Sequence, residues 1–108
     1  MAAEVPKGLA IEQIWAIEAT YAADAAERRP AVRPEHLARI GELRLAGIVI
    51  EAGAFADMSG SLILVRARDE AAALEIAKRD AYTRSGVWAG IRVRAFGRVV
   101  RSEELTTG

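Results

Sequence analysis

The amino-acid sequence predicts an α+β domain built from four strands and two helices. Four apolar segments rich in β-branched and aromatic residues predict strands, at residues 11–21, 48–55, 61–67 and 88–100. Two segments with helical periodicity and recognisable end signals predict helices, at 34–46 and 70–79. The resulting order, β-α-β-β-α-β, is the ferredoxin-like arrangement, with a four-stranded antiparallel sheet and both helices on one face.

The first predicted strand, residues 11–21, is apolar on both of its faces. Trp15 and Ile17 alternate along it with Ile14 and Ala16. Two helices cover only one face of the sheet, so something else must cover the other face. A second copy of the same sheet is the simplest candidate, and we therefore expect a homodimer formed through the sheet face.

The first predicted helix is preceded by a segment rich in alanine and charged residues. Residues 22–33 are interpreted as a long connection, with a helical turn at 22–27 as the alternative. The helix is predicted to begin at Pro34, because the fixed φ of proline suits the first helical position and its missing N–H costs nothing there. Gly47 is expected to cap the C-terminal end.

Several single residues mark the boundaries of the remaining elements. Gly53 suggests a bend or bulge in the second strand. The apolar run 62–65 predicts a strand that is buried on both faces, and Asp69 is a good N-cap for the second helix. Residues 80–85 are interpreted as a short turn that closes at Gly86.

Length and composition describe one soluble globular domain. The 108 residues, 52% of them hydrophobic, suffice for a single core, with a flexible lead-in at 1–10, the domain at 11–100 and a polar tail at 101–108. Fifteen basic and fifteen acidic residues cancel, which argues against nucleic acid or an anionic membrane as partner. No segment looks like a signal peptide or reaches the roughly 18 apolar residues of a membrane helix. A cytoplasmic location is expected.

His36, the sole histidine, is the first candidate for chemistry. It shares a helical stripe with Ile40 and Leu43, so its side chain should point inward. A neutral imidazole exchanges protons readily near pH 7. The alternative is a structural histidine at the edge of the core, bound to a backbone carbonyl. A metal site would need more than one histidine and is not expected, and the chain has no cysteine to serve as ligand or nucleophile.

Asp80 is the second candidate for a chemical role. It shares a face of the second helix with Ala73, Ile76 and Ala77, which places it on the apolar side at the C-terminal end. The alternative is an exposed, unpaired residue at the end of a helix.

Two segments of the chain resemble the YciI-like (YCII-related) proteins. The first is Arg33-Pro34-Glu35-His36-Leu37-Ala38-Arg39-Ile40, followed by Gly47 and Gly53. The second is Asp80-Ala81-Tyr82, followed by Gly86 and by Phe96 in the last strand. The resemblance covers about residues 11–100. One departure is Ala81, since the family usually has a proline after the aspartate.

The resemblance implies a dimeric α+β barrel, in which two sheets pack face to face. It also implies a pocket near the sheet with a His–Asp pair, at positions that match His36 and Asp80. Arg33 and Tyr82 match further residues of the two motifs and become candidates for substrate binding. The alternatives are a surface cation for Arg33 and a packing role for Tyr82, with its hydroxyl at the pocket rim. No cofactor is implied.

Three functions are compatible with these residues. The first is a small-molecule lyase or isomerase, with His36 as general base, Asp80 orienting it and Arg33 holding an anionic group. The second is a module that binds an unknown small molecule in the same pocket without turnover. The third is a structural or accessory dimer whose sheet face is the functional surface. A haem-binding role for His36 is the least favoured.

Overall fold

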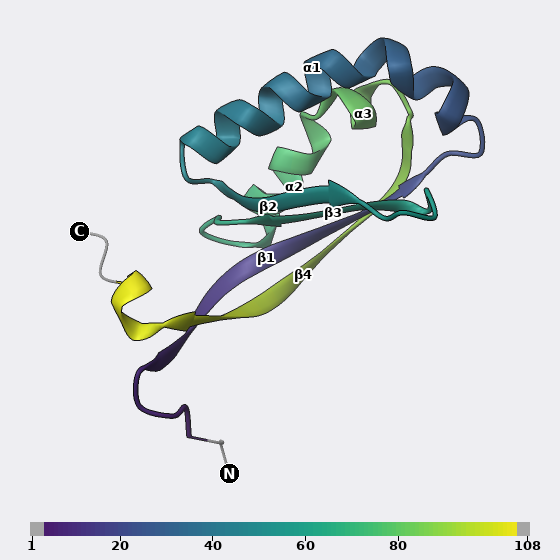
Figure 1. Cartoon of the computed structure of the whole chain (residues 1–108). Coiled ribbons are helices and arrows are strands. Elements are labelled where there is room, and N and C mark those ends of the chain that lie inside the picture. Colours follow the sequence, from purple (N-terminus) through teal and green to yellow (C-terminus); the bar gives the residue numbers. More distant parts are fainter. Residues whose placement is uncertain (1–3, 106–108) are drawn as a thin grey trace.

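Four antiparallel strands form one sheet in the order β2-β3-β1-β4 (Figure 1). The computed structural model describes residues 4–105; the first three residues of the lead-in expected at 1–10 and the last three of the tail expected at 101–108 lie outside the described residues. The strands are β1 (Leu9–Tyr21), β2 (Val49–Ala54), β3 (Gly60–Val65) and β4 (Trp88–Arg101). The long strands β1 and β4 pair along their whole length, and β1 is one of the two inner strands of the sheet.

The helices α1 (Ala25–Leu45), α2 (Glu70–Lys78) and α3 (Ala81–Arg84) all lie on one face of the sheet (Figure 1). A 3-10 turn, η1 (Ser102–Leu105), follows β4. This arrangement confirms the predicted α+β, ferredoxin-like fold. None of the helices in the described part of the chain is long and apolar enough to cross a membrane.

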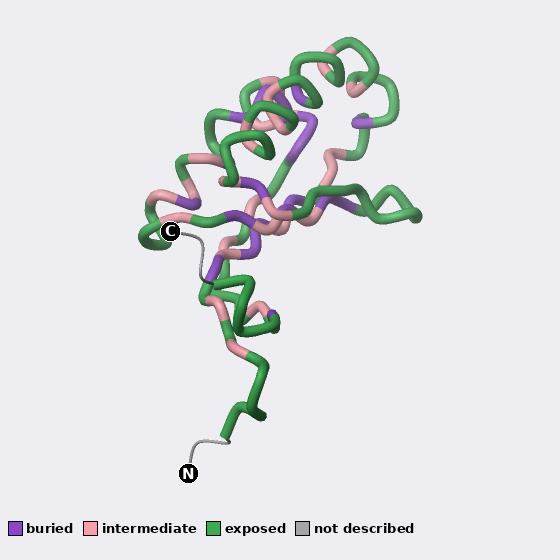
Figure 2. Tube along the Cα trace, turned by 60° about the vertical axis from the view of Figure 1, so that its left-hand side comes forward, coloured by how far each residue is buried: buried purple, intermediate pink, exposed green. Residues whose placement is uncertain are grey.

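The core lies between the helices and the facing side of the sheet. Ile17 of β1 stands opposite Ile63 of β3 and Val93 of β4, and the first two are almost completely buried. Ala73 and Ala77 of α2 are buried against the same cluster. In Figure 2 the buried residues concentrate in this part of the molecule, whereas the chain toward the N-terminus is exposed.

The interpretation of residues 22–33 as a long connection is wrong. The helix α1 begins at Ala25, so Pro34 lies inside it rather than at its start, and Pro30 lies inside it as well. A proline within a helix leaves the carbonyl four residues earlier without its hydrogen bond. Both prolines are exposed, so water can reach that side of the helix, and the surrounding alanines favour helix.

Contacts with α3 hold the first half of α1 in place. The Arg28 guanidinium donates hydrogen bonds to the backbone carbonyls of Ser85 and of Gly86, the latter at 3.2 Å. Glu35 forms an ion pair with Arg84. These partners lie about 50 or more residues away in the sequence. The local pattern around Pro34 could therefore not reveal that the helix begins earlier.

Two predicted helix ends are confirmed. Gly47 follows the C-cap of α1 and has φ +79°, a conformation that glycine adopts without steric cost. Asp69 caps α2, and its carboxylate accepts a hydrogen bond of 2.8 Å from the Ala72 N–H. Local end signals therefore located these boundaries correctly.

Two local details differ from the prediction. Residues 80–85 contain the single-turn helix α3, and Asp80 is its N-cap rather than a residue on the face of α2. The irregularity in β2 falls between Val49 and Glu51, where the pairing with β3 shifts, and not at Gly53.

The ends of β1 and β4 project from the body of the molecule as a two-stranded ribbon (Figure 1). Ile11 pairs there with Val99, and both side chains are exposed, Val99 at 65%. β1 begins at Leu9 and β4 ends at Arg101, so the ribbon takes up residues that were expected in the lead-in and the tail.

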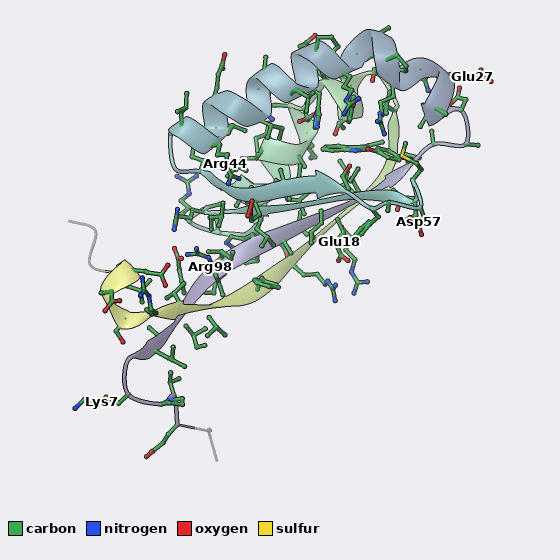
Figure 3. The ribbon with its side chains drawn as sticks, viewed as in Figure 1. Lys7, Glu18, Glu27, Arg44, Asp57 and Arg98 are labelled. Atoms are coloured by element: carbon green, nitrogen blue, oxygen red, sulfur yellow. The ribbon has the colours of Figure 1, made fainter. Side chains whose placement is uncertain are left out.

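The face of the sheet opposite the helices mixes apolar and charged side chains. Glu12 receives hydrogen bonds from Arg66 at 2.6 Å and Arg98 at 2.9 Å, and these contacts, that of Arg66 above all, hold the pKa of Glu12 below its usual value. Glu18 pairs with Arg94 at 2.7 Å. Figure 3 shows Glu18 and Arg98 on this side of the sheet. The face is therefore less uniformly apolar than the sequence suggested.

Gly60 at the start of β3 is required by a close approach of two strands. A Cβ at this position would lie 2.1 Å from the Ala19 carbonyl oxygen, whereas a Cβ at Gly53 would meet nothing within 4 Å. We expect Gly60→Ala to lower the free energy of unfolding by at least about 2 kcal/mol in urea denaturation. The control, Gly53→Ala, should be neutral or slightly stabilising. Equal stability of the two variants would contradict this account.

Candidate active site

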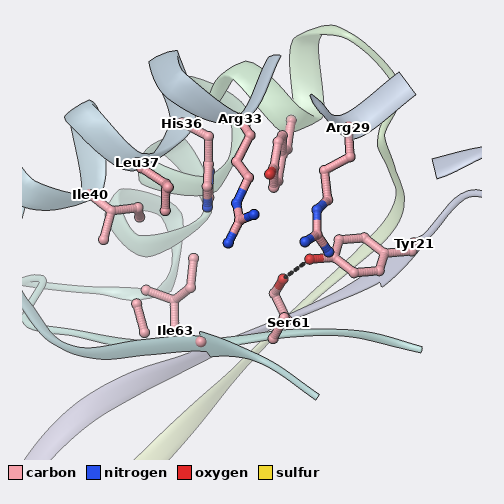
Figure 4. Close-up of a pocket in the computed structure, with 12 residues that line it drawn as sticks. Tyr21, Arg29, Arg33, His36, Leu37, Ile40, Ser61 and Ile63 are labelled. Carbon is pink, nitrogen blue, oxygen red and sulfur yellow. Dashed lines mark hydrogen bonds between the residues drawn. The ribbon is translucent and has the colours of Figure 1, made fainter. Parts of the chain in front are cut away.

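A pocket lies between α1 and the sheet, in the region where β2 and β3 pair (Figure 4). Its volume is about 180 Å³. A protein cavity of roughly 150 Å³ can hold benzene, so this pocket suits a single-ring or short-chain molecule. Arg29, Arg33 and His36 of α1 form one wall, and Ser61 of β3 lies on the opposite one.

His36 contacts Asp80 behind the pocket wall. The imidazole Nδ1 lies 2.7 Å from Asp80 Oδ1, and both side chains are buried, Asp80 with 1% of its surface exposed. The same oxygen accepts the Tyr82 backbone N–H at 2.9 Å, which is the capping hydrogen bond of α3. A carboxylate can only accept here, so the neutral ring carries its proton on Nδ1. The lone pair of Nε2 is then available on the pocket side of the ring.

Arg39, a partly exposed arginine, lies on the far side of the carboxylate. Arg39 Nη1 is 3.6 Å from Asp80 Oδ2, an ion pair that is too long for a hydrogen bond. Both atoms are buried and have no hydrogen-bond partner within the described chain. The guanidinium balances the negative charge that Asp80 brings into the interior.

Aromatic rings fix the plane of the imidazole. Tyr82 stacks on His36, with the ring centroids 3.9 Å apart and the planes 7° from parallel. Trp88 contacts the histidine edge-on, with a centroid distance of 5.4 Å. Tyr82 is itself buried, and this burial raises the pKa of its hydroxyl above the usual value.

Two arginines on the same face of α1 reach into the pocket (Figure 4). Arg33 was predicted, whereas Arg29, four residues earlier, was not. Arg29 lies over the ring of Tyr21, 5.7 Å from its centroid, and has Met58 Sδ 3.3 Å from Nη1. Within residues 4–105 neither arginine has a carboxylate at ion-pair distance. The pocket is therefore positively charged and suits an anionic ligand.

The structure brings the four predicted site residues together at this pocket. Arg33, His36 and Tyr82 line it, and Asp80 lies behind His36. Three further lining residues with polar groups were not among the predicted site residues: Arg29, Tyr21 and Ser61. Extending the helical pattern one turn before Pro34 would have found Arg29. Tyr21 and Ser61 are 40 residues apart, and no local sequence pattern indicates that their side chains are in contact. In the described part of the chain, no three His, Cys, Asp or Glu side chains are grouped to hold a metal ion.

Comparison with known families identifies the class of protein. The family model of the YCII-related domain matches residues 14–97, which includes all four strands and all three helices in whole or in part. The chain belongs to the YCII-related domain family. None of the curated proteins compared matches the chain.

A solved structure has a similar fold. It is the 5-chloro-2-hydroxyhydroquinone dehydrochlorinase of Burkholderia phenoliruptrix AC1100, in complex with 2,5-dihydroxybenzoquinone. The TM-score is 0.68 at 18% sequence identity, and the match covers 77% of this chain and 92% of that one. At this identity the likeness establishes the fold.

The raised pKa of Tyr82 leads to a titration experiment. The chain has two tyrosines, so Tyr21→Phe leaves Tyr82 as the sole source of the tyrosinate absorbance band. Its midpoint should lie above the ordinary value of 10.0. The stability that comes from keeping this hydroxyl protonated is complete below the pKa of the unfolded chain. It is lost as the pH rises through the higher native pKa.

A solvent-exposed tyrosine amide, titrated alongside, provides the reference for this experiment. Circular dichroism at each pH shows whether the protein is still folded. A midpoint equal to that of the reference, in protein that is still folded, would contradict the burial of the Tyr82 hydroxyl.

Proposed function

We propose that this protein is a small-molecule enzyme of the lyase or isomerase type, in which His36 is the general acid and base. The single observation that carries the proposal is the 2.7 Å contact between His36 Nδ1 and Asp80 Oδ1 beside a pocket. Such a contact orients the ring and leaves Nε2 to accept a proton from a bound molecule. A positioned acid or base of this kind contributes typically about 10² to 10⁴ in rate.

Each of the other proposed site residues has a separate role. Asp80 holds the tautomer of His36 and stabilises the imidazolium that forms when the ring accepts a proton. Arg33 binds an anionic group of the substrate with its fork of donors. Tyr82 supports the imidazole from one side and contributes to the pocket wall. The proposed chemistry uses no cofactor.

The proposed reaction begins with proton removal from a carbon next to a carbonyl group. The C–H proton moves to His36 Nε2, and the electron pair of that bond passes through the carbon to the carbonyl oxygen, which gives an enolate. In an isomerase the imidazolium then returns the proton to a different atom. In a lyase the carbonyl re-forms, a C=C bond forms to the adjacent carbon, the leaving group departs from that carbon with its bonding electrons, and the imidazolium passes its proton to the leaving group or to water.

The similar solved structure supports the lyase variant of this proposal. Its name describes the loss of hydrogen chloride from a ring compound, and its bound molecule is a quinone. A substrate of this size would fit a pocket of about 180 Å³. The alternative is a module that holds a small anion without turnover, which the two arginines alone could achieve. In either case the proposed setting is the cytoplasm, with neither nucleic acid nor membrane as partner.

Hydrogen–deuterium exchange on small carbonyl and phenolic acids tests the proposal. In deuterated buffer the protein should catalyse loss of a C–H signal in the NMR spectrum of at least one such compound. His36→Gln should lower the rate at least about 100-fold, and Asp80→Asn should lower it about tenfold or more. Ser59→Ala, which changes an exposed serine directly before β3, should leave the rate unchanged.

The outcomes separate the enzyme from the binding module. Exchange that is equally fast in wild type and His36→Gln would contradict the role of the histidine. Tight binding of a screened compound without any exchange would favour the module. Asp80→Asn must be checked by circular dichroism, because Asp80 also caps α3.

We also propose a homodimer, formed through the sheet face opposite the helices. Phe96 is exposed there, and its neighbour across the β1–β4 pair is Ile14. Leu62 and Leu64 of β3 are on the same face, and no helix of the described chain covers it. An apolar surface of this kind is typical of an interface. The ion pairs of Glu12 and Glu18 would surround or cross that interface.

Light scattering on dilute protein tests the dimer. The wild type should have twice the chain mass of 11.6 kDa. Phe96→Arg would place an unpaired charge in the interface and should weaken association by at least about 100-fold. Leu45→Arg is the control, because Leu45 at the end of α1 is already 91% exposed. A wild-type protein of monomer mass would rule out the dimer.

A further inference from the structure

A chain of three hydrogen-bonding side chains ends in the pocket at Tyr21. The Trp88 indole Nε1 lies 3.3 Å from Ser61 Oγ, and Ser61 Oγ lies 3.1 Å from the Tyr21 hydroxyl (Figure 4 shows the second contact). Trp88 and Ser61 are buried, while Tyr21 is partly exposed to the pocket. The chain comes from three strands, since Trp88 begins β4, Ser61 is in β3 and Tyr21 ends β1.

The direction of these hydrogen bonds follows from the chemistry of the first member. An indole N–H can only donate, so Ser61 Oγ accepts from Trp88. The Ser61 hydroxyl has one proton of its own, and a buried hydroxyl proton needs an acceptor. Within the described chain, the Tyr21 oxygen is the acceptor in reach. Ser61 therefore donates to Tyr21, and the Tyr21 proton is directed away from Ser61 and available to a ligand.

The charges around Tyr21 indicate what kind of ligand atom would take this proton. The Arg29 guanidinium lies over the Tyr21 ring, and Arg33 reaches into the same pocket (Figure 4). Neither has a carboxylate partner among the residues described. A hydroxyl donor beside two cations stabilises an oxygen atom that carries negative charge. Figure 4 shows Tyr21 and His36 on different sides of the pocket, so one molecule could contact both.

We propose that Tyr21 and Arg29 form the oxyanion-binding side of this pocket. The substrate class is then a single-ring phenol or a small enolisable carbonyl compound. When a proton passes from carbon to His36 Nε2, the electron pair moves onto the substrate oxygen. Tyr21 donates its hydrogen bond to that oxygen and keeps its proton throughout. The catalytic part rests on the proposed function, whereas the binding part can be tested without any turnover.

Binding of 4-nitrophenolate provides that test, because it is a single-ring oxyanion whose visible absorbance reports hydrogen bonding. Its methyl ether, 4-nitroanisole, has the same ring but no oxyanion. Wild-type protein should bind the phenolate more tightly than the ether. Tyr21→Phe keeps the ring and removes the donor, so it should weaken phenolate binding about tenfold or more and leave ether binding within about twofold.

Two serine variants separate the hydrogen-bond chain from general damage. Ser61→Ala removes the group that directs the Tyr21 proton and should lower the preference for phenolate over ether. Ser59→Ala, an exposed serine outside the pocket lining, should not change it. Thermal unfolding of each variant shows that the protein is folded at the titration temperature.

Each result has a definite meaning for the proposal. No phenolate binding by wild-type protein at millimolar concentration, or equal phenolate binding by wild type and Tyr21→Phe, would overturn it. Loss of binding in Tyr21→Phe supports it even if His36→Gln leaves deuterium exchange unchanged, in which case the general-base role alone fails. Exchange that needs His36 but tolerates Tyr21→Phe would instead retain the base and reject the oxyanion side.

Discussion

The carboxylate of Asp80 is the group on which both the fold near the pocket and the pocket itself depend. One of its oxygens accepts from the Tyr82 N–H and from His36 Nδ1, and the other faces Arg39. The first contact starts α3, the second joins α3 to α1, and the third balances the buried charge. Loss of the carboxylate would leave the Tyr82 N–H and His36 Nδ1 without their acceptor and Arg39 without its counter-charge, so its structural role and its proposed chemical role cannot be separated by removing it outright.

The fold supplies the polar groups around the pocket from two layers, the helices and the sheet. The helical layer supplies the histidine and the arginines, because α1 carries Arg29, Arg33 and His36 on one face. The sheet supplies hydroxyl and indole groups, whose positions follow from strand pairing. Thr20 stands opposite Gly60 in the β1–β3 ladder, and this register brings Ser61 to the Tyr21 hydroxyl. A shift of one residue would turn the serine to the other face of the sheet.

Features that neighbouring residues determine could be predicted from the sequence, whereas features that depend on contacts between distant residues could not. Apolar patterning located the strands, and the helical stripe through Ile40 and Leu43 correctly predicted that the His36 side chain points inward. The pairing of His36 with Asp80, 44 residues apart, came from family resemblance and not from spacing. The start of α1 was misplaced, since its stabilising contacts from Arg28 are long-range. That error also hid Arg29, and the Tyr21–Ser61 contact needed a strand register that no single segment encodes.

The stacked arrangement of His36 and Tyr82 has a stereochemical consequence. The imidazole is held in one orientation, because it stacks on Tyr82 at a centroid distance of 3.9 Å and its Nδ1 contacts the Asp80 carboxylate. Only Nε2 then meets the bound molecule, always from the same side. If His36 is the base, a proton that it takes from one carbon and returns to another must stay on one face of the substrate. An isomerisation by this base would be suprafacial, and any stereocentre formed at the carbon that receives the proton would have a single configuration.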